Sequence, residues 1–241
     1  MIKTTWHQRV AMLSLDRPAS LNALDPDLLH ALGFALNEAL THGAAGIVLK
    51  GEGRAFSAGA DLRWFAGRSA QGPEAHAAAL SEMLEIGGRI VQAFIKAPVP
   101  VVSAINGPCI GGALGIALAT DVALAARSAY FCLPQVPKLG IVPDLGATWV
   151  LPRLVGRPRA MAISLLGDKI PAEQAEHWGM VWRCVDDAEL QAQALATAHG
   201  LAAMPVEAII ATRRLIDESP ASSIQWQLAQ EAHQQQALSR P

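Results

Sequence analysis

Two buried strands that each end in a turn of glycine and alanine constrain this chain more than any other feature of its sequence. The first strand is predicted over residues 46–50, an apolar run bounded by glycines, and residues 58–60 continue with almost no side-chain bulk. A ligand can therefore approach the main chain closely at this turn. Asp61 is placed to cap a short helix through Trp64, which would turn nearby N–H groups toward an anion.

A second turn of the same kind follows further along the chain. Residues 99–105 are predicted as another buried strand that ends at Asn106, Gly107 and Pro108, and an apolar helix is predicted over residues 111–119. Each turn presents main-chain N–H groups with little side-chain cover. Two such turns that converge on one oxygen would form an oxyanion hole.

The rest of the chain alternates between predicted strands and helices. Residues 2–15 are predicted as one or two strands, and Asp25-Pro26 is a strong helix start, with Gly43 as the stop. Strands separated by helices indicate an α/β core with parallel pairing. The other predictions are helices over 74–96, 144–153, 158–166, 171–178, 187–203, 205–217 and 221–238, strands over 121–126 and 180–185, and a flexible polar stretch over 67–73.

Several motifs in this chain resemble those of the crotonase family, the enoyl-CoA hydratases and isomerases. The motifs cover residues 54–62, 106–115 and 139–156 in the family's order and spacing, and residues 16–24 also fit its pattern. Any one of them is a weak signal, but the combination is specific. The resemblance implies the crotonase fold, an α/β spiral of repeated ββα units over residues 1–185, followed by a helical trimerisation or lid region over 186–241.

The resemblance also implies what the protein binds. The expected partner is an acyl-CoA thioester substrate, and no separate cofactor is expected because coenzyme A is part of the substrate. Family members usually assemble as trimers or hexamers, so a homotrimer or a dimer of trimers is expected. The final predicted helix, with Ile224, Trp226 and Leu228 among glutamines, is a candidate for the oligomer contact or for a cover over the pocket. A solvated terminal helix is the alternative.

Matched residue by residue to the family, the two oxyanion-hole N–H groups fall on Ala60 and Gly112. The main chain around residues 58–62 would also meet the adenine of coenzyme A. Arg54 is among the arginines nearest to this turn and is a candidate for the phosphates, with a solvated surface position as the alternative. The residues expected to bind substrate are therefore Ala58, Gly59, Asp61, Leu62, Gly111 and Arg54.

The acid–base positions depart from the hydratase pattern. Hydratases hold one water between two glutamates, and the first of these positions is Gly115 here. The second is Gln135 when counted forward from Phe131, or Val136 when counted back from Gly140, because the chain carries one extra residue. Neither side chain exchanges a proton at neutral pH, so efficient hydration by the usual route is not expected.

One carboxylate, Asp144, remains where isomerases of the family carry an aspartate. Shifting a double bond needs one base that removes a proton α to the thioester and returns it two carbons along. The alternative role of Asp144 is an ordinary N-cap of a helix beginning at Leu145. A helix N-terminus would lower the pKa of Asp144 and an apolar pocket would raise it. Glu82 and Glu85 are fallback acids, with surface positions as the alternative interpretation.

The overall composition argues against several other classes of protein. With a net charge of −2, the chain lacks the excess of positive charge expected of a protein that binds nucleic acid or an anionic membrane. Three cysteines without CxxC spacing, and an N-terminus without a signal-peptide core, predict a cytoplasmic protein. Prolines interrupt the long uncharged run over residues 97–120, so it is not predicted to span a membrane. The seven histidines are scattered singly, and no metal site is predicted.

We therefore predict an enoyl-CoA isomerase-type enzyme with Asp144 as its proton shuttle. Two alternatives stay open. One is an enoyl-CoA hydratase with non-standard acid and base residues, and the other is a non-catalytic acyl-CoA-binding protein that has kept the oxyanion hole. The acyl chain is not specified by the sequence. The first question for the structure is whether Asp144 faces the thioester site or caps its helix.

Overall fold

A six-stranded sheet forms the centre of the protein, whose computed structural model describes residues 1–239. Its strands are β1 (Ile2–His7), β2 (Val10–Leu15), β3 (Gly46–Gly51), β4 (Val101–Ile105), β6 (Val122–Ala126) and β9 (Arg183–Val185), in that spatial order. β1 and β2 form an antiparallel hairpin, and every later pair of neighbours is parallel. The parallel pairing predicted from the alternation of strands and helices is confirmed.

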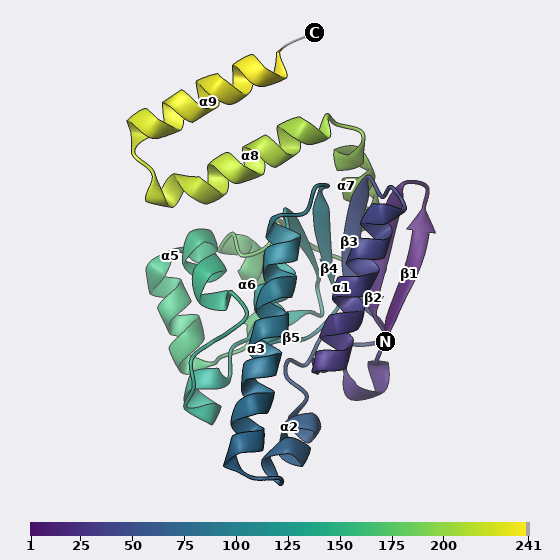
Figure 1. The fold of residues 1–241 in the computed structure, drawn as a ribbon, viewed down its shortest axis with the longest axis vertical. Coiled ribbons are helices and arrows are strands. Elements are labelled where there is room, and N and C mark those ends of the chain that lie inside the picture. Colours follow the sequence, from purple (N-terminus) through teal and green to yellow (C-terminus); the bar gives the residue numbers. More distant parts are fainter. Residues whose placement is uncertain (240–241) are drawn as a thin grey trace.

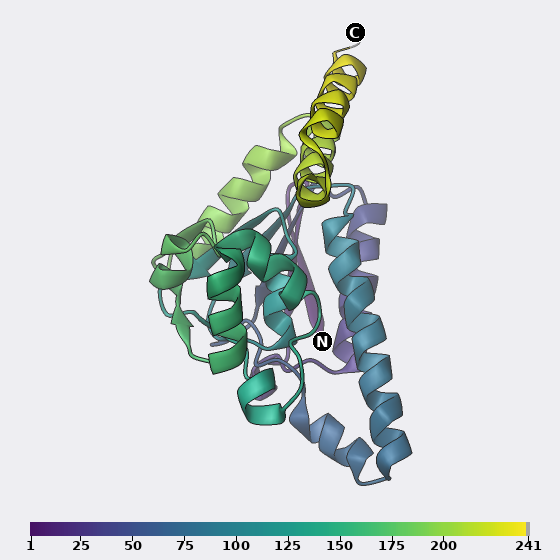
Figure 2. The ribbon, with the colours of Figure 1, turned by 90° about the vertical axis from the view of Figure 1, so that its left-hand side faces the viewer.

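Helices cover both faces of this sheet (Figures 1 and 2). α1 (Pro26–Thr41) and α3 (Pro73–Ile95) lie side by side on one face, and α7 (Leu190–Ala202) packs against β3 and β4 on the other. α1 begins where the sequence predicts, because Asp25 Oδ1 accepts a hydrogen bond from the Leu28 N–H at 2.8 Å. The apolar side chains of the sheet are therefore enclosed between two helical layers.

A smaller, three-stranded sheet and a π-helix lie next along the chain. The sheet consists of β5 (Cys109–Ile110), β7 (Tyr130–Cys132) and β8 (Ile170–Pro171), and the π-helix is η2 (Gln135–Leu139). These strands were not predicted, because two or three residues carry no readable periodicity. The other elements are α2 (Leu62–Ser69), α4 (Gly112–Leu118), α5 (Ala147–Leu166), α6 (Ala172–His177) and the short 3₁₀ turns η1 (Pro18–Ser20) and η3 (Ser219–Ala221).

Several predicted boundaries were wrong. The stretch predicted as flexible over 67–73 includes the last turn of α2, where Ser69 Oγ donates a hydrogen bond to the Phe65 carbonyl at 2.9 Å. The helices predicted over 144–153 and 158–166 are joined in α5, which is broken at Gly156 by a φ of 74° and a ψ of 160°. Only glycine adopts that conformation without strain, so the predicted break lies in the right place.

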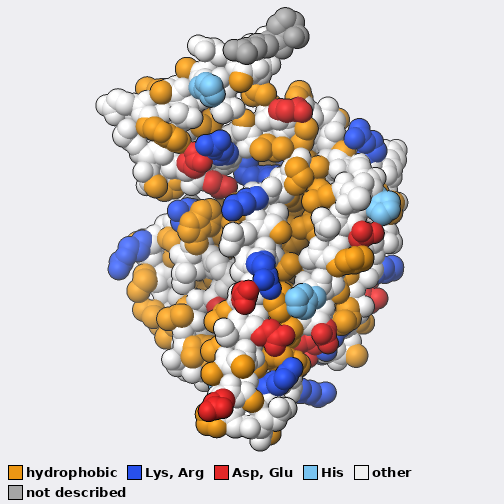
Figure 3. Space-filling view, viewed as in Figure 1, with side chains coloured by type: hydrophobic (Ala, Val, Ile, Leu, Met, Phe, Trp, Pro, Cys, Tyr) orange, Lys and Arg blue, Asp and Glu red, His pale blue; other side chains and the backbone are white. Residues whose placement is uncertain are grey.

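The C-terminal helices stand away from the sheet (Figures 1 and 2). α8 (Val206–Glu218) and α9 (Ile224–Leu238) pack on each other, and neither fully buries any residue. Arg213 fixes α8 to the core: it donates to both carboxylate oxygens of Asp121, at 2.6 and 2.7 Å, and to three main-chain carbonyls before β4. A cavity separates α8 from α5, and Figure 3 shows a hollow on that side of the molecule. The same view shows hydrophobic side chains on the surface of the C-terminal helices α8 and α9.

Within the described part of the chain, no single helix is both long enough and apolar enough to cross a bilayer. α7 together with α8 and η3 has the necessary length and apolarity only as a pair, and that pair is bent by 104°.

Candidate active site

The two turns of glycine and alanine meet beyond the carboxyl ends of β3 and β4. The Ser57 N–H donates to the Pro108 carbonyl at 3.1 Å, and the Ile110 N–H donates to the Ser57 carbonyl at 3.0 Å. Gly59 has a φ of 82°, and a Cβ there would lie 2.7 Å from the Ile110 carbonyl oxygen. Glycine is therefore needed for the close approach of the two turns. The predicted convergence of the turns is present.

Two main-chain N–H groups at this junction have no acceptor within the described residues. Ala60 lies between two paired residues: the Leu24 N–H donates to the Gly59 carbonyl at 2.7 Å, and the Asp61 N–H donates to the Leu24 carbonyl at 2.8 Å. The Ala60 N–H itself is left over. Gly112 is the first residue of α4, so its N–H has no intrahelical acceptor. These are the two donors that the family resemblance implies.

The carboxylate of Asp144 lies against the second turn. A Cβ built on Gly112 would be only 2.8 Å from Asp144 Oδ1, and Gln135 Nε2 donates to the same oxygen at 3.3 Å. Burial raises the pKa of Asp144, and the hydrogen bond from Gln135 lowers it to a lesser extent. Asp144 therefore holds a proton more readily than an exposed aspartate does, and it does so beside a free N–H donor.

Asp144 does not cap a helix through its side chain, so the N-cap interpretation and the helix start at Leu145 were wrong. α5 begins at Ala147, and its N-cap residue is Gly146, which has no side chain. Asp144 contributes only its main-chain carbonyl, which accepts a hydrogen bond from the Ala147 N–H at 2.9 Å. Leu145 and Gly146 both have left-handed backbones, with φ of 45° and 84°. This turn separates the Asp144 carboxylate from the start of the helix.

Comparison with known proteins identifies the family. The profile described as enoyl-CoA hydratase/isomerase matches residues 5–240, almost the whole chain. This protein belongs to the enoyl-CoA hydratase/isomerase family. The predicted crotonase-family membership and crotonase fold are thereby confirmed, and the protein is an acyl-CoA enzyme of that family.

Individual relatives agree with this assignment. The chain is 38% identical over 229 residues to a "probable enoyl-CoA hydratase" of Rhodobacter capsulatus, covering 95% of this chain and 86% of that protein. It is 36% identical over 233 residues to 1,2-epoxyphenylacetyl-CoA isomerase of Escherichia coli, covering 96% of this chain and 87% of that protein. A solved structure of a "putative Enoyl-CoA hydratase/isomerase" from Mycobacterium abscessus superposes with a TM-score of 0.92 at 31% identity, covering 100% of this chain and 92% of that one.

This member of the enoyl-CoA hydratase/isomerase family has no room for a side chain at position 115. A Cβ on Gly115 would lie 2.0 Å from the Leu145 carbonyl oxygen and 3.0 Å from the Ala147 nitrogen. Real Cβ atoms do not come so close to main-chain atoms. Main chain therefore fills the space that a larger side chain, such as the glutamate of hydratases, would need here.

Gln135, rather than Val136, is the residue that reaches Asp144. The Gln135 side chain is buried, with 4% of the residue exposed, whereas Val136 is half-buried. Both residues belong to the π-helix η2. Gln135 Oε1 has no hydrogen-bond partner within the described residues. Of the two candidates for the second hydratase position, the neutral amide of Gln135 is thus the one beside Asp144.

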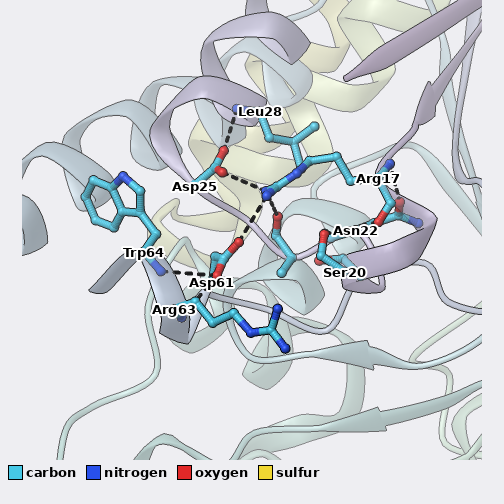
Figure 4. Close-up of polar contacts among 10 residues, drawn as sticks. Arg17, Ser20, Asn22, Asp25, Leu28, Asp61, Arg63 and Trp64 are labelled. Carbon is cyan, nitrogen blue, oxygen red and sulfur yellow. Dashed lines mark hydrogen bonds and ion pairs between the residues drawn. The ribbon is translucent and has the colours of Figure 1, made fainter. Parts of the chain in front are cut away.

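A charged network that sequence reasoning missed lies beside the first turn (Figure 4). Arg17 donates to Asp25 Oδ2 at 2.7 Å and to Asp61 Oδ2 at 3.1 Å. The other oxygen of Asp61 accepts from the N–H groups of Arg63 and Trp64 at 3.1 and 3.2 Å, so the predicted Asp61 cap of α2 is confirmed. The motif over residues 16–24 was the available signal, but its contacts with Asp61 were not readable from one sequence.

The remaining candidate residues differ in exposure. Leu62 is 65% exposed and Arg54 is exposed, so both side chains are open to a ligand. The Gly111 N–H is already used, because it donates to the Cys132 carbonyl at 2.9 Å. The fallback acids Glu82 and Glu85 are both exposed on α3. Within residues 1–239, no group of three or more His, Cys, Asp and Glu side chains is arranged to hold a metal ion.

Proposed function

We propose that this protein is an enoyl-CoA isomerase in which Asp144 is the proton shuttle. Asp144 takes a proton from the α-carbon of a 3-enoyl-CoA, and the C–H electron pair moves through the carbonyl carbon onto the thioester oxygen. The resulting dienolate is held by the N–H groups of Ala60 and Gly112. Asp144 then returns the proton to the γ-carbon, which leaves the double bond conjugated with the thioester. The observation that carries this proposal is the Asp144 carboxylate against Gly112.

The surroundings of Asp144 support a role as base and acid in turn. A base that must return its proton works best when its pKa lies near the operating pH, and burial shifts the pKa of Asp144 upward. Gln135 donates to the carboxylate but cannot take the proton from it. Asp144 is therefore the one group of this pair that can carry a proton.

Hydration is less well supported by the same site. The usual hydratase mechanism needs two carboxylates around one water, and this chain offers Gln135 and the closed position Gly115 instead. The names of relatives do not decide the matter, because they include the Escherichia coli isomerase and also 2,3-dehydroadipyl-CoA hydratase, at 35% identity. The choice between reactions rests on the arrangement around Asp144.

Coenzyme A is proposed to bind along the first turn, over residues 58–62, with Arg54 near its phosphates. Asp61 would act there through its main chain, because its carboxylate oxygens are engaged by Arg17 and by the first turn of α2. A homotrimer assembled through the region over 186–241 is proposed as well. Exposed apolar side chains on α9, such as Ile224 at 64% and Leu228 at 57%, support it.

The test is an isomerase assay on the Asp144→Asn variant. A 3-enoyl-CoA is converted to the 2-enoyl-CoA, whose conjugated thioester absorbs in the ultraviolet. An asparagine at this position keeps the size of the side chain but takes up no proton, so turnover should fall by at least about 100-fold while acyl-CoA affinity stays nearly constant. Asp27→Asn, at an exposed aspartate in the first turn of α1, is the matched control.

Three results would contradict the proposal. Unchanged turnover in Asp144→Asn would remove Asp144 from the chemistry. Rapid hydration of crotonyl-CoA by the wild type would favour the hydratase alternative. Tight binding of acyl-CoA without turnover of any enoyl-CoA would favour the non-catalytic binding protein.

A further inference from the structure

The motif over residues 16–24 has no part in the proposed chemistry, yet it holds the first oxyanion turn. Ser57 Oγ donates to the Asn22 carbonyl at 2.7 Å, and the main chain of Leu24 pairs on both sides of Ala60. These bonds fix the two peptide groups that flank Ala60. The direction of its free N–H is therefore set from the N-terminal segment.

Arg17 is the charged member of this segment (Figure 4). Its Nη1 donates to Asp25 Oδ2 at 2.7 Å and to the Ala23 carbonyl at 2.8 Å, and its Nη2 donates to Asp61 Oδ2 at 3.1 Å. The second oxygen of each carboxylate caps a helix, α1 for Asp25 and α2 for Asp61. The two aspartate side chains are only 11% and 12% exposed. One guanidinium thus compensates two mostly buried carboxylates and links two helix starts.

We propose that Arg17 is a positioning residue of the oxyanion hole, which holds Asp61 on its cap and neutralises two carboxylates beside Ala60. This inference rests on the proposed assignment of the hole to Ala60 and Gly112. An enolate oxygen carries negative charge, and an uncompensated carboxylate near it opposes its stabilisation, most strongly where water is excluded. Without Arg17, the two carboxylates would repel each other, and Asp61 adjoins the residue that donates to the enolate.

If Arg17 had a purely structural role, its replacement would change only the free energy of unfolding. The test therefore measures how strongly the protein polarises the carbonyl of a bound thioester. Cinnamoyl-CoA is the probe, because its conjugated absorption moves to longer wavelength when hydrogen bonds polarise the thioester carbonyl. In Arg17→Met, we expect a smaller red shift and a kcat lower by roughly 10- to 100-fold, since misplacing a catalytic group by about 1 Å can cost about 100-fold. The Kd of butyryl-CoA, a saturated ligand, should change much less.

Two further variants separate charge and position from folding. Arg17→Met combined with Asp61→Asn removes a buried charge but keeps a good capping residue, so most of the red shift should return. Arg17→Lys keeps the charge with a single donor group and should be intermediate. Arg127→Met is the matched control, because Arg127 also pairs with two carboxylates, Glu173 and Asp186, at an exposed site after β6.

Each outcome decides the question. A wild-type red shift and kcat in Arg17→Met would overturn the proposal, and so would a loss that the added Asp61→Asn fails to recover. If Arg17→Met does not fold, the double variant and Arg17→Lys carry the same test. No red shift in the wild type would refute the oxyanion hole itself, and the proposal with it. A normal red shift without isomerisation would instead refute only the role of Asp144.

Discussion

Replacing Gly115 with alanine tests whether the main chain of Leu145 closes the first hydratase position. The new Cβ would lie 2.0 Å from the Leu145 carbonyl oxygen, far inside the 3.4 Å at which ordinary contact begins. Overpacking of this kind costs about 1–3 kcal/mol. The upper part of that range applies, because backbone rather than a flexible side chain must move, and the better helix propensity of alanine offsets about 1 kcal/mol. We expect a net loss of roughly 2 kcal/mol in the free energy of unfolding.

The assay is thermal and urea unfolding of Gly115→Ala beside Gly88→Ala. Gly88 lies inside α3, and a Cβ there would meet nothing within 4 Å, so its replacement should be neutral or stabilising by up to about 1 kcal/mol. A loss of about 2 kcal/mol in Gly115→Ala corresponds to a Tm lower by roughly 4–8 °C for a chain of this size.

Activity should fall with stability in the Gly115 variants. Any shift of Leu145 carries Asp144 with it, because the two residues are adjacent. Gly115→Glu should therefore lose isomerase activity without gaining hydration of crotonyl-CoA. Wild-type stability in Gly115→Ala, or rapid hydration by Gly115→Glu, would refute the reasoning.

Three other groups in the structure give measurable expectations. Burial raises the pKa of Asp144, so wild-type isomerisation should fall as pH drops through that raised pKa. A raised native pKa also lowers stability as pH rises above the unfolded value, so Asp144→Asn should have a higher Tm than the wild type at pH 7 and no advantage in strong acid. Arg213→Met removes the cation from the Asp121 carboxylate, whose side chain is 15% exposed and which keeps only the Val101 N–H as a partner among the described residues, so it should cost about 3 kcal/mol in urea unfolding; equal stability would contradict the anchoring of α8. Burial raises the pKa of the Cys109 thiol, so a thiol reagent should label it only after unfolding, and labelling in native protein would show that the pairing of β5 with β7 opens.

Features set by a few neighbouring residues could be predicted from the sequence. The start of α1 depends on Asp25 and Pro26. The start of α2 depends on the Asp61 side chain, which accepts hydrogen bonds from the N–H groups of Arg63 and Trp64, two and three residues further along the chain. Each involves contacts within one turn of helix, and each was found where it was predicted. The alternation of strands and helices likewise gave the parallel sheet, because a parallel pair requires a crossover connection.

Features that depend on pairs far apart in the chain could not be predicted. Arg17 and Asp61 are separated by 44 residues, and no local pattern marks their ion pair. The main chain of Leu145 fills the space beside Gly115 because Leu145 has an unusual φ of 45°. The presence of a leucine at this position does not predict that backbone conformation. The basicity of Asp144 was also undecided by sequence, since burial and the helix start predict opposite shifts. In the structure, burial raises the pKa of Asp144, and the N-cap of α5 is Gly146 rather than Asp144.

The contact between position 115 and Leu145 limits how this chain can change its reaction by mutation. A carboxylate at position 115 requires the loop over residues 143–146 to move first, yet moving that loop alone withdraws Asp144 from the site. Under the proposed function, either single step therefore yields a protein with neither chemistry, even though side-chain substitution leaves the two proposed main-chain donors in place. Laboratory evolution that accepts one substitution at a time should fail to convert this enzyme into a hydratase. Libraries that vary position 115 together with residues 143–146 should be able to yield a hydratase.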